Sequence, residues 1–353
     1  MAQAGYEVTL AAVYPADELK EGIQILGLPR VPRWKRPLLW WRLLRIARRS
    51  SADIYHFHDP ELLLLLPFLR LLARKPVIYD IHESYADFIL LKEYLPAWFR
   101  KPLSRLIGLA EPQMARLSQG LIFADDEIGN SFSALTCPKT TLFNFPGAAV
   151  IEEGQQASNK RLSGNPVVLH LGSHESGRGP FLMLKAFREV VYVVPEARLL
   201  LVGPFYPPAL ENVMRQVIAE FGLEAAVTIT GQVTFEKVGI HLRHAAIGWV
   251  PLEPVAKYNK NIPTKMFEYM AYGLPQVCSD LPSTRPFIES GPSGLLVTPD
   301  DPKSHAEAII QLLQNPESAT AMGKRGQSMV ASHYNWAQME PRLLKLYAEV
   351  MAN

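Results

Sequence analysis

Short apolar runs alternate with longer amphipathic segments along most of this chain of 353 residues. Alternation of this kind is typical of βαβ units and a mostly parallel sheet. In the first half, the strand-like runs are residues 6–13, 53–57, 76–81 and 120–124, and the helical segments are residues 37–49, 60–73 and 99–117. Asp59, Pro60 and Glu61 mark one helix start, because they supply an N-cap, a proline at the first helical position and an early acid.

The second half repeats the alternation, so the pattern predicts two doubly wound α/β domains. Its strand-like runs are residues 167–172, 198–203, 226–231, 247–251, 275–279 and 294–297. Residues 147–165 are polar and lack a sustained apolar period, which indicates a linker. The predicted organisation is a first domain at residues 1–147, a linker at 148–165, a second domain at 166–332, and a helix at 333–353 that packs back toward the first domain. Ligands of such sheets bind beyond the carboxyl ends of the strands.

Composition and charge narrow the class of protein. Hydrophobic residues make up 48% of the chain, which fits a globular protein, and 36 basic against 34 acidic residues give no general reason to expect a nucleic-acid binder. Two cysteines exclude a disulfide framework and fit a reducing compartment. The first ten residues lack a signal-peptide pattern, and the longest apolar stretch is too short to span a membrane. We therefore expect a cytoplasmic protein.

A glycine-rich segment, residues 172–179, follows one predicted strand and precedes a helix. It nearly matches a phosphate-binding P-loop, but Arg178 and Gly179 stand where that loop needs Lys and then Ser or Thr. A dinucleotide fingerprint fails as well, because Leu182 occupies the place of its third glycine. What remains is an arginine between glycines on a strand-to-helix turn, which suits bidentate phosphate binding. The alternative is an ordinary surface turn.

A second segment, residues 261–277, has the pattern of a loop, a helix, a glycine stop and a strand. Pro263 and Thr264 start the helix, and Lys265 and Glu268 lie three residues apart, so they share the face near its N-terminus. Such a terminus is suited to anion binding. The alternative is a salt bridge between these two residues on a solvated face.

Residues 265–280 resemble the donor-site signature of the retaining glycosyltransferases of family 4, which have the two-domain GT-B fold. Other segments resemble the family in the same order: residues 172–179, LLLVG at 199–203, AAIGWVPLEP at 245–254, GLLVTPDD at 294–301 and, more loosely, DIYHFHDPELL and VIYDIHES in the first half. The resemblance implies two Rossmann-like doubly wound domains facing across a cleft, the first on the acceptor side and the second binding the donor.

The resemblance also implies roles for individual residues. Arg178 matches the residue that holds the donor diphosphate, Lys265 approaches the same group, and His82 matches a histidine that faces the donor sugar. The remaining donor-binding positions are Gly172, Ser173, Lys260, Asn261, Ile262, Pro263, Thr264 and Glu268, of which Glu268 matches the glutamate that accepts hydrogen bonds from ribose. The family often has an arginine in place of Ser173 and a sugar-contacting glutamate in place of Lys260.

The expected activity is transfer of a sugar from a nucleotide-diphosphate donor to a glycan or lipid-linked acceptor, with retention of configuration. A cation and a helix N-terminus would stabilise the leaving diphosphate, so we expect no metal and no other cofactor. No Asp-x-Asp motif lies near these loops. The alternative is a protein of the same fold that binds sugar nucleotides with little or no turnover, which Lys260 favours.

Other polar clusters have simpler interpretations. The pairs His56 with His58 and His241 with His244 each share one face of an element and could ligate a metal, but we expect no metal site. The acidic run from residue 125 to 127 cannot form a glycosidase pair, because adjacent carboxylates cannot flank a glycosidic bond. We expect it to cap a helix.

Residues 30–49 contain eight basic residues, three tryptophans and no acid. On a helix from Pro37, Arg42, Arg45 and Arg49 line one face and apolar residues line another. This arrangement suits an anionic membrane surface, which would make the protein peripheral on the inner face of a membrane, or a lipid-linked acceptor. The alternative is a solvated helix that packs its apolar face on the first sheet.

The family normally has a strand, a glycine-rich loop and a helix before a strand such as residues 6–13. We therefore expect the first sheet to lack a central strand and to leave two edges unpaired. The alternative is direct pairing of residues 6–13 with residues 53–57.

Overall fold

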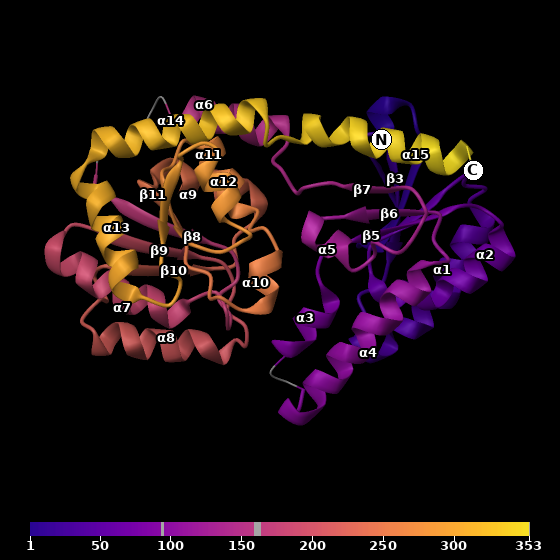
Figure 1. The fold of residues 1–353 in the computed structure, drawn as a ribbon, viewed down its shortest axis with the longest axis horizontal. Coiled ribbons are helices and arrows are strands. Elements are labelled where there is room, and N and C mark those ends of the chain that lie inside the picture. The colour runs from indigo at the N-terminus through magenta and orange to yellow at the C-terminus, as the bar shows by residue number, and fades with distance from the viewer. Residues whose placement is uncertain (93–94, 159–163, 353) are drawn as a thin grey trace. The chain divides into compact units, whose positions relative to one another are not determined.

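The computed structural model describes residues 1–92, 95–158 and 164–352. The chain forms two compact units (Figure 1). Unit 1 comprises Met1–Leu142 and Glu340–Asn353, and unit 2 comprises Phe143–Met339. Each unit is an α/β structure with a parallel sheet, so the predicted fold class is confirmed.

Unit 2 contains a six-stranded sheet whose strands are all parallel. The strands are β8 (Val167–Leu171), β9 (Arg198–Val202), β10 (Val227–Gly231), β11 (Ile247–Val250), β12 (Gln276–Ser279) and β13 (Gly294–Val297). Their spatial order, β10-β9-β8-β11-β12-β13, is the 3-2-1-4-5-6 order of a doubly wound sheet. The order reverses between β8 and β11, which is where such sheets bind ligands.

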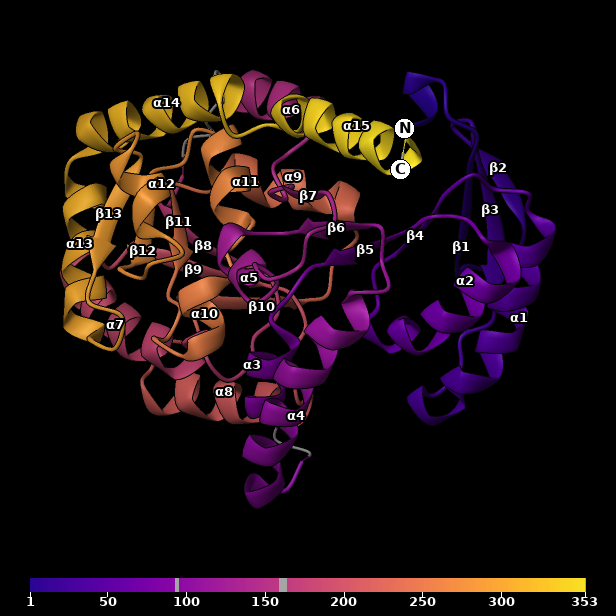
Figure 2. The ribbon, with the colours of Figure 1, turned by 45° about the vertical axis from the view of Figure 1, so that its right-hand side comes forward.

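Helices cover both faces of this sheet, and α8 and α14 lie on opposite sides of it (Figures 1 and 2). The helices of unit 2 are α6 (Ala148–Ser158), α7 (Pro180–Val193), α8 (Ala209–Glu220), α9 (Phe235–His244), α10 (Ala256–Lys260), α11 (Lys265–Ala271), α12 (Arg285–Glu289), α13 (Pro302–Gln314), α14 (Pro316–Ser332) and the start of α15 (Trp336–Ala352). The core packs Phe187 of α7 and Ile309 of α13 around Leu199, Leu201 and Trp249 of the strands. All six strands were predicted to within one residue, because strands buried on both faces have nearly continuous apolar sequences.

Unit 1 contains two separate sheets (Figure 2). The first has the order β1-β3-β2, and the second has the order β4-β5-β6-β7 with all strands parallel. The strands are β1 (Val8–Val13), β2 (Glu18–Lys20), β3 (Ile23–Leu28), β4 (Tyr55–Phe57), β5 (Val77–Ile81), β6 (Gly120–Phe123) and β7 (Lys139–Thr141). Within the described residues β1 pairs with β3 and β4 pairs with β5, so the alternative in which residues 6–13 pair with 53–57 is wrong.

The helices of unit 1 largely match the predicted segments. They are α1 (Arg36–Arg49), α2 (Leu66–Ala73), α3 (Tyr85–Leu90), α4 (Ala97–Ala115), α5 (Asp126–Asn130) and the end of α15, with 3₁₀ turns at Ala2–Ala4, Arg33–Lys35 and Pro60–Leu65. The predicted helix at 60–73 is split, because Pro67 lacks an N–H and its ring conflicts with the carbonyl four residues earlier. Asp59 makes no side-chain cap, whereas Asp125 caps α5 by accepting from Ile128 N at 2.8 Å.

The stretch predicted as a linker contains helix α6, and residues 159–163 of that stretch lie outside the described residues. Helix α6 packs on α9, α11 and α14. A Cβ on Gly154 would lie 2.3 Å from the Ala271 carbonyl oxygen, so the helices approach through a glycine. That contact needs no large apolar side chain. The helix therefore lacks the regular spacing of apolar residues from which an amphipathic helix is predicted.

The end of α15 packs on the second sheet of unit 1. The Tyr347 hydroxyl lies 2.7 Å from His56 Nδ1, and a Cβ on Gly120 would lie 2.7 Å from the Val350 Cγ2 atom. On the same sheet the Tyr79 hydroxyl donates to Glu111 Oε1 at 2.7 Å, and both side chains are buried. Burial raises the pKa of Glu111 to about 7, although the hydrogen bond from Tyr79 lowers it.

Glu111 gives unit 1 a pH-dependent stability. Its pKa is higher in the folded state than its ordinary value of 4.5, so its contribution is complete below about pH 4.5 and is lost as pH rises through about 7. We expect the free energy of unfolding of the wild type, relative to Glu111→Gln, to fall by about 3 kcal/mol between about pH 4 and pH 8. Denaturant unfolding measures this difference. Glu7→Gln, at an exposed position, serves as the control, and a parallel pH profile for Glu111→Gln and the wild type would contradict the assignment.

Candidate functional site

Two cationic side chains meet at the carboxyl end of β8, beside the switch point of the unit 2 sheet. Gly172 has a φ of 110°, and a Cβ on it would lie 3.2 Å from Arg178 Nη1 and 3.4 Å from Lys265 Nζ. The structure therefore brings together three of the predicted residues from two segments far apart in sequence. The approach of both side chains requires glycine at position 172.

Arg178 is held in place by groups on its own loop and on α10. Its Nε lies 3.1 Å from Glu175 Oε1 and donates to the Tyr258 hydroxyl, also at 3.1 Å. The loop turns tightly against the residue that follows β11, since a Cβ on Gly179 would lie 2.4 Å from the Pro251 carbonyl oxygen. The arginine is therefore part of a fixed turn, and its role toward a phosphate stays a prediction.

Lys265 is buried, and its Nζ lies 3.3 Å from His170 Nε2. His170 Nδ1 lies 3.1 Å from the Trp249 carbonyl oxygen, which assigns the imidazole proton to Nδ1 and leaves Nε2 to accept from the lysine. Burial, followed by the charge of Lys265, holds the pKa of His170 well below its ordinary range. Burial and then the Arg178 charge likewise lower the pKa of Lys265. Two cations that repel each other in a buried site are suited to a dianionic ligand.

His174 adds a neutral imidazole beside these cations. Its ring stacks on Phe205 with centroids 4.5 Å apart, and neither ring nitrogen has a hydrogen-bond partner in the described part of the chain. Burial, and then the charges of Lys265 and Arg178, lower its pKa to about 3. An unpartnered buried N–H is costly unless a ligand accepts from it. His170 and His174 were not predicted, although their positions two residues before and after Gly172 could have identified them.

At the start of helix α11, the amides of Met266 and Phe267 donate to the carbonyl oxygens of Pro263 and Thr264. Anion binding at this terminus stays a prediction. Lys265 is buried, and within the described residues no ion pair joins it to Glu268, so the predicted alternative of a salt bridge on a solvated face is wrong.

Glu268 and Thr264 line a cavity of about 210 Å³ in unit 2. Its other lining residues are Asn144, Phe145, Pro146, Gly147, Val150, Glu153, Val238, Gly239, Leu242 and Tyr272. Burial raises the pKa of Glu268, although the charge of Lys265 lowers it. Glu268 therefore lines a partly apolar cavity, and its predicted hydrogen bonds with a ribose stay a prediction.

The other predicted donor-binding residues lie on the loops around this site. The Ser173 hydroxyl donates to Glu175 Oε1 at 3.4 Å, and Asn261 N donates to the Lys257 carbonyl oxygen at 2.8 Å. Lys260 ends α10, and Ile262 and Pro263 are half-buried between α10 and α11. Their contacts with a donor stay a prediction.

His82 lies in unit 1, directly after β5. Its Nε2 lies 3.5 Å from Asp80 Oδ2 and 2.9 Å from His58 Nδ1. Burial would raise the pKa of Asp80, but hydrogen bonds from His56, His58 and His82 hold it well below its ordinary range. The predicted role of His82 toward a donor sugar stays a prediction.

Both halves of the chain match models of glycosyltransferase families. Residues 165–315 match the model described as "Glycosyl transferases group 1", and residues 1–140 match the model described as "Glycosyltransferase Family 4". The chain belongs to the group 1, family 4 glycosyltransferases, as the sequence resemblance implied, and it has their GT-B fold.

Individual relatives agree with this classification. The chain is 24% identical over 327 residues to a phosphatidyl-myo-inositol mannosyltransferase of Mycobacterium leprae, covering 89% of this chain and 78% of the relative. Sucrose-phosphate synthase from Thermosynechococcus elongatus has a similar fold, with a TM-score of 0.79, 19% identity and coverage of 99% and 90%. The Anabaena protein HepE, solved in complex with UDP-glucose, has a TM-score of 0.70, 16% identity and coverage of 93% and 86%.

Proposed function

We propose that this glycosyltransferase transfers a sugar from a nucleotide-diphosphate donor to a glycan or lipid-linked acceptor, with retention of configuration and without a metal at the diphosphate. The observation that carries the proposal is the convergence of Arg178 and Lys265 on Gly172, at the switch point of a doubly wound sheet. Two fixed cations at that place can take over the charge-neutralising role that a metal has in other transferases.

The chemistry is stabilisation of the leaving group. Breaking the bond between the sugar and the diphosphate builds negative charge on the phosphate, and preorganised cations bind this charge more strongly in the transition state than in the ground state. Arg178 offers a planar fork of donors for phosphate oxygens. His170 positions Lys265 by accepting from its Nζ, and the neutral His174 supplies an N–H to the bound donor.

The donor of this reaction is a sugar nucleotide. HepE binds UDP-glucose, and its similarity in fold supports a sugar nucleotide as the donor here. Lys260, at the end of α10, is a cation at a position where the family usually has a glutamate. A lysine there favours a donor sugar that carries a carboxylate, so UDP-glucuronate belongs beside UDP-glucose in the donor panel.

Turnover tests the proposal directly. Donor hydrolysis and transfer are measured with UDP-, GDP- and dTDP-sugars, in the presence of EDTA. We expect Arg178→Ala and Lys265→Ala each to lower turnover by roughly 10²–10³, the cost of losing one preorganised charge-stabilising group. Arg188→Ala, on the exposed side of α7, is the matched control.

The outcomes separate the proposal from its alternative. Wild-type turnover in both variants would overturn the assignment of the site, and loss of wild-type turnover in EDTA would overturn metal independence. Binding of a sugar nucleotide with neither hydrolysis nor transfer would favour a binding protein of the same fold.

We also propose that the protein attaches peripherally to an anionic membrane. Helix α1 buries Leu44 and Ala47 within unit 1, as the simpler alternative expects. Together with the 3₁₀ turn before it, which contains Trp34, the helix exposes the large apolar side chains of Leu38 and Trp41 beside the exposed Arg42, Arg45 and Arg49. An exposed apolar cluster beside exposed arginines is the pattern of an interfacial helix. In the described ranges no helix is long and apolar enough to cross a membrane.

Vesicle flotation tests this attachment. Each basic residue near an anionic surface contributes about 1 kcal/mol, so replacing Arg42, Arg45 and Arg49 together by Gln should weaken binding at low salt by roughly 100-fold. Salt should weaken wild-type binding, because the charges are screened within a Debye length. The control replaces three exposed lysines of unit 2, Lys185, Lys303 and Lys324, by Gln. Absence of wild-type flotation at low salt, or equal flotation of the arginine variant, would contradict the attachment.

A further inference from the structure

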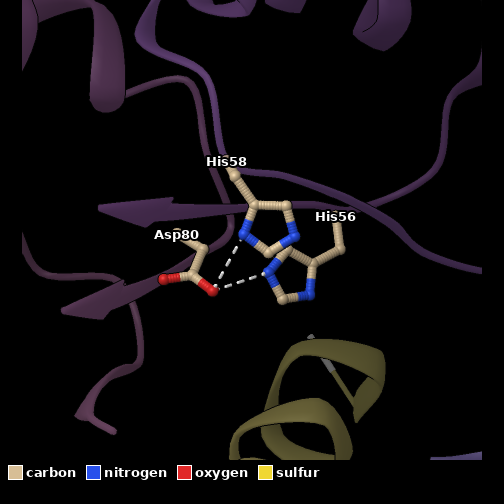
Figure 3. Close-up of side chains that lie close together, drawn as sticks. All are labelled: His56, His58 and Asp80. Carbon is tan, nitrogen blue, oxygen red and sulfur yellow. Dashed lines mark hydrogen bonds and ion pairs between the residues drawn. The ribbon is translucent and has the colours of Figure 1, made fainter. Parts of the chain in front are cut away.

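Three histidines surround one carboxylate oxygen in unit 1. His56 lies on β4 and His58 just after it, Asp80 lies on the neighbouring strand β5, and His82 follows that strand. Figure 3 shows His56 and His58 pointing toward the same oxygen of Asp80. His56 Nε2 and His58 Nδ1 each lie 3.2 Å from Asp80 Oδ2, and His82 Nε2 lies 3.5 Å from it. Asp80 is buried, whereas His58 and His82 are accessible to solvent.

These separations fit the ligand shell of a small metal ion. A tetrahedral zinc ion holds nitrogen and oxygen ligands at about 2.0–2.2 Å, which places neighbouring ligand atoms roughly 3.3 Å apart. The ligand atoms of His56, His58 and Asp80 all lie within 4.8 Å of one another. His82 Nε2 lies 2.9 Å from His58 Nδ1 but outside this set of three ligand atoms.

Hydrogen bonds also join these side chains. His58 Nδ1 lies 2.9 Å from His82 Nε2, and the histidines donate to Asp80. A metal ion would replace the protons on the His56 and His58 nitrogens that face Asp80, because a ligating nitrogen must be deprotonated.

The Tyr347 hydroxyl supports the orientation of the His56 ring. It lies 2.7 Å from His56 Nδ1, so when Nε2 binds an ion, the ring proton on Nδ1 can be donated to this hydroxyl. A ligating histidine usually donates its other ring N–H to an oxygen in this way, which fixes the tautomer and the ring orientation.

We propose that His56 Nε2, His58 Nδ1 and Asp80 Oδ2 bind a divalent transition metal ion of the zinc class. Imidazole nitrogen with one carboxylate suits zinc and its neighbours better than Mg²⁺ or Ca²⁺, which prefer oxygen ligands. This replaces the sequence expectation of no metal site. The site lies wholly within unit 1 and does not depend on the proposed transfer reaction.

Calorimetric titration of the full chain with Zn²⁺, after treatment with EDTA and its removal, tests the site. We expect one ion to bind the wild type, and Co²⁺ in its place to give the visible absorption of a tetrahedral ion. His58→Ala and Asp80→Asn should lower the affinity at least about 100-fold, and Tyr347→Phe by about 10–100-fold, because it removes only the support of one ligand.

The controls address folding and specificity. His58 is about half exposed, so His58→Ala keeps the test decisive even if Asp80→Asn does not fold. The matched control is His241→Ala with His244→Ala, the other histidine pair that its spacing places on one helix face. It should bind Zn²⁺ as the wild type does, and Mg²⁺ should not displace the ion. A wild type that binds no Zn²⁺, or a His58→Ala titration equal to that of the wild type, would overturn the site, whatever the transfer assay shows.

Discussion

The repulsion between Arg178 and Lys265 is the constraint on which the candidate site depends. Both cations lie against Gly172, and Lys265 is buried with a neutral histidine as its contact. The fold holds them there, because the loop after β8 turns tightly against the residue that follows β11 and helix α11 begins at the same edge of the sheet. A dianionic ligand would relieve the repulsion, so the paired cations favour binding of a diphosphate.

Most of the unit 2 fold could be predicted, because its strands are buried on both faces and have continuous apolar sequences. Strands β2, β3 and β7 of unit 1 were missed, and of these β2 is exposed along its length and has no burial pattern to detect. Helix α6 was missed because it approaches α11 through Gly154. The failures at β2 and α6 share one cause. A pattern of large apolar residues detects an element only where such residues make its contacts.

The candidate site was predictable to the extent that its residues lie on strand-to-helix turns. Arg178 and Lys265 lie there, and the structure brings them together. His170 and His174 were missed because their importance comes from burial beside cations, which is visible only in the structure, although both lie two residues from Gly172. The cluster of His56, His58 and Asp80 was likewise visible only in part from the sequence. The spacing of His56 and His58 was visible, but Asp80 joins them only through the pairing of β4 with β5.

Proton uptake on UDP binding is the most direct test of the paired cations. Burial and then Arg178 lower the pKa of Lys265, and a diphosphate should raise it, so binding at a pH where Lys265 is partly deprotonated should take up protons from the buffer. Calorimetry in buffers of different ionisation enthalpy measures this uptake. We expect uptake by the wild type, falling affinity as pH rises, and loss of the uptake in Lys265→Met. UDP binding without proton uptake, or with equal uptake in Lys265→Met, would contradict the account.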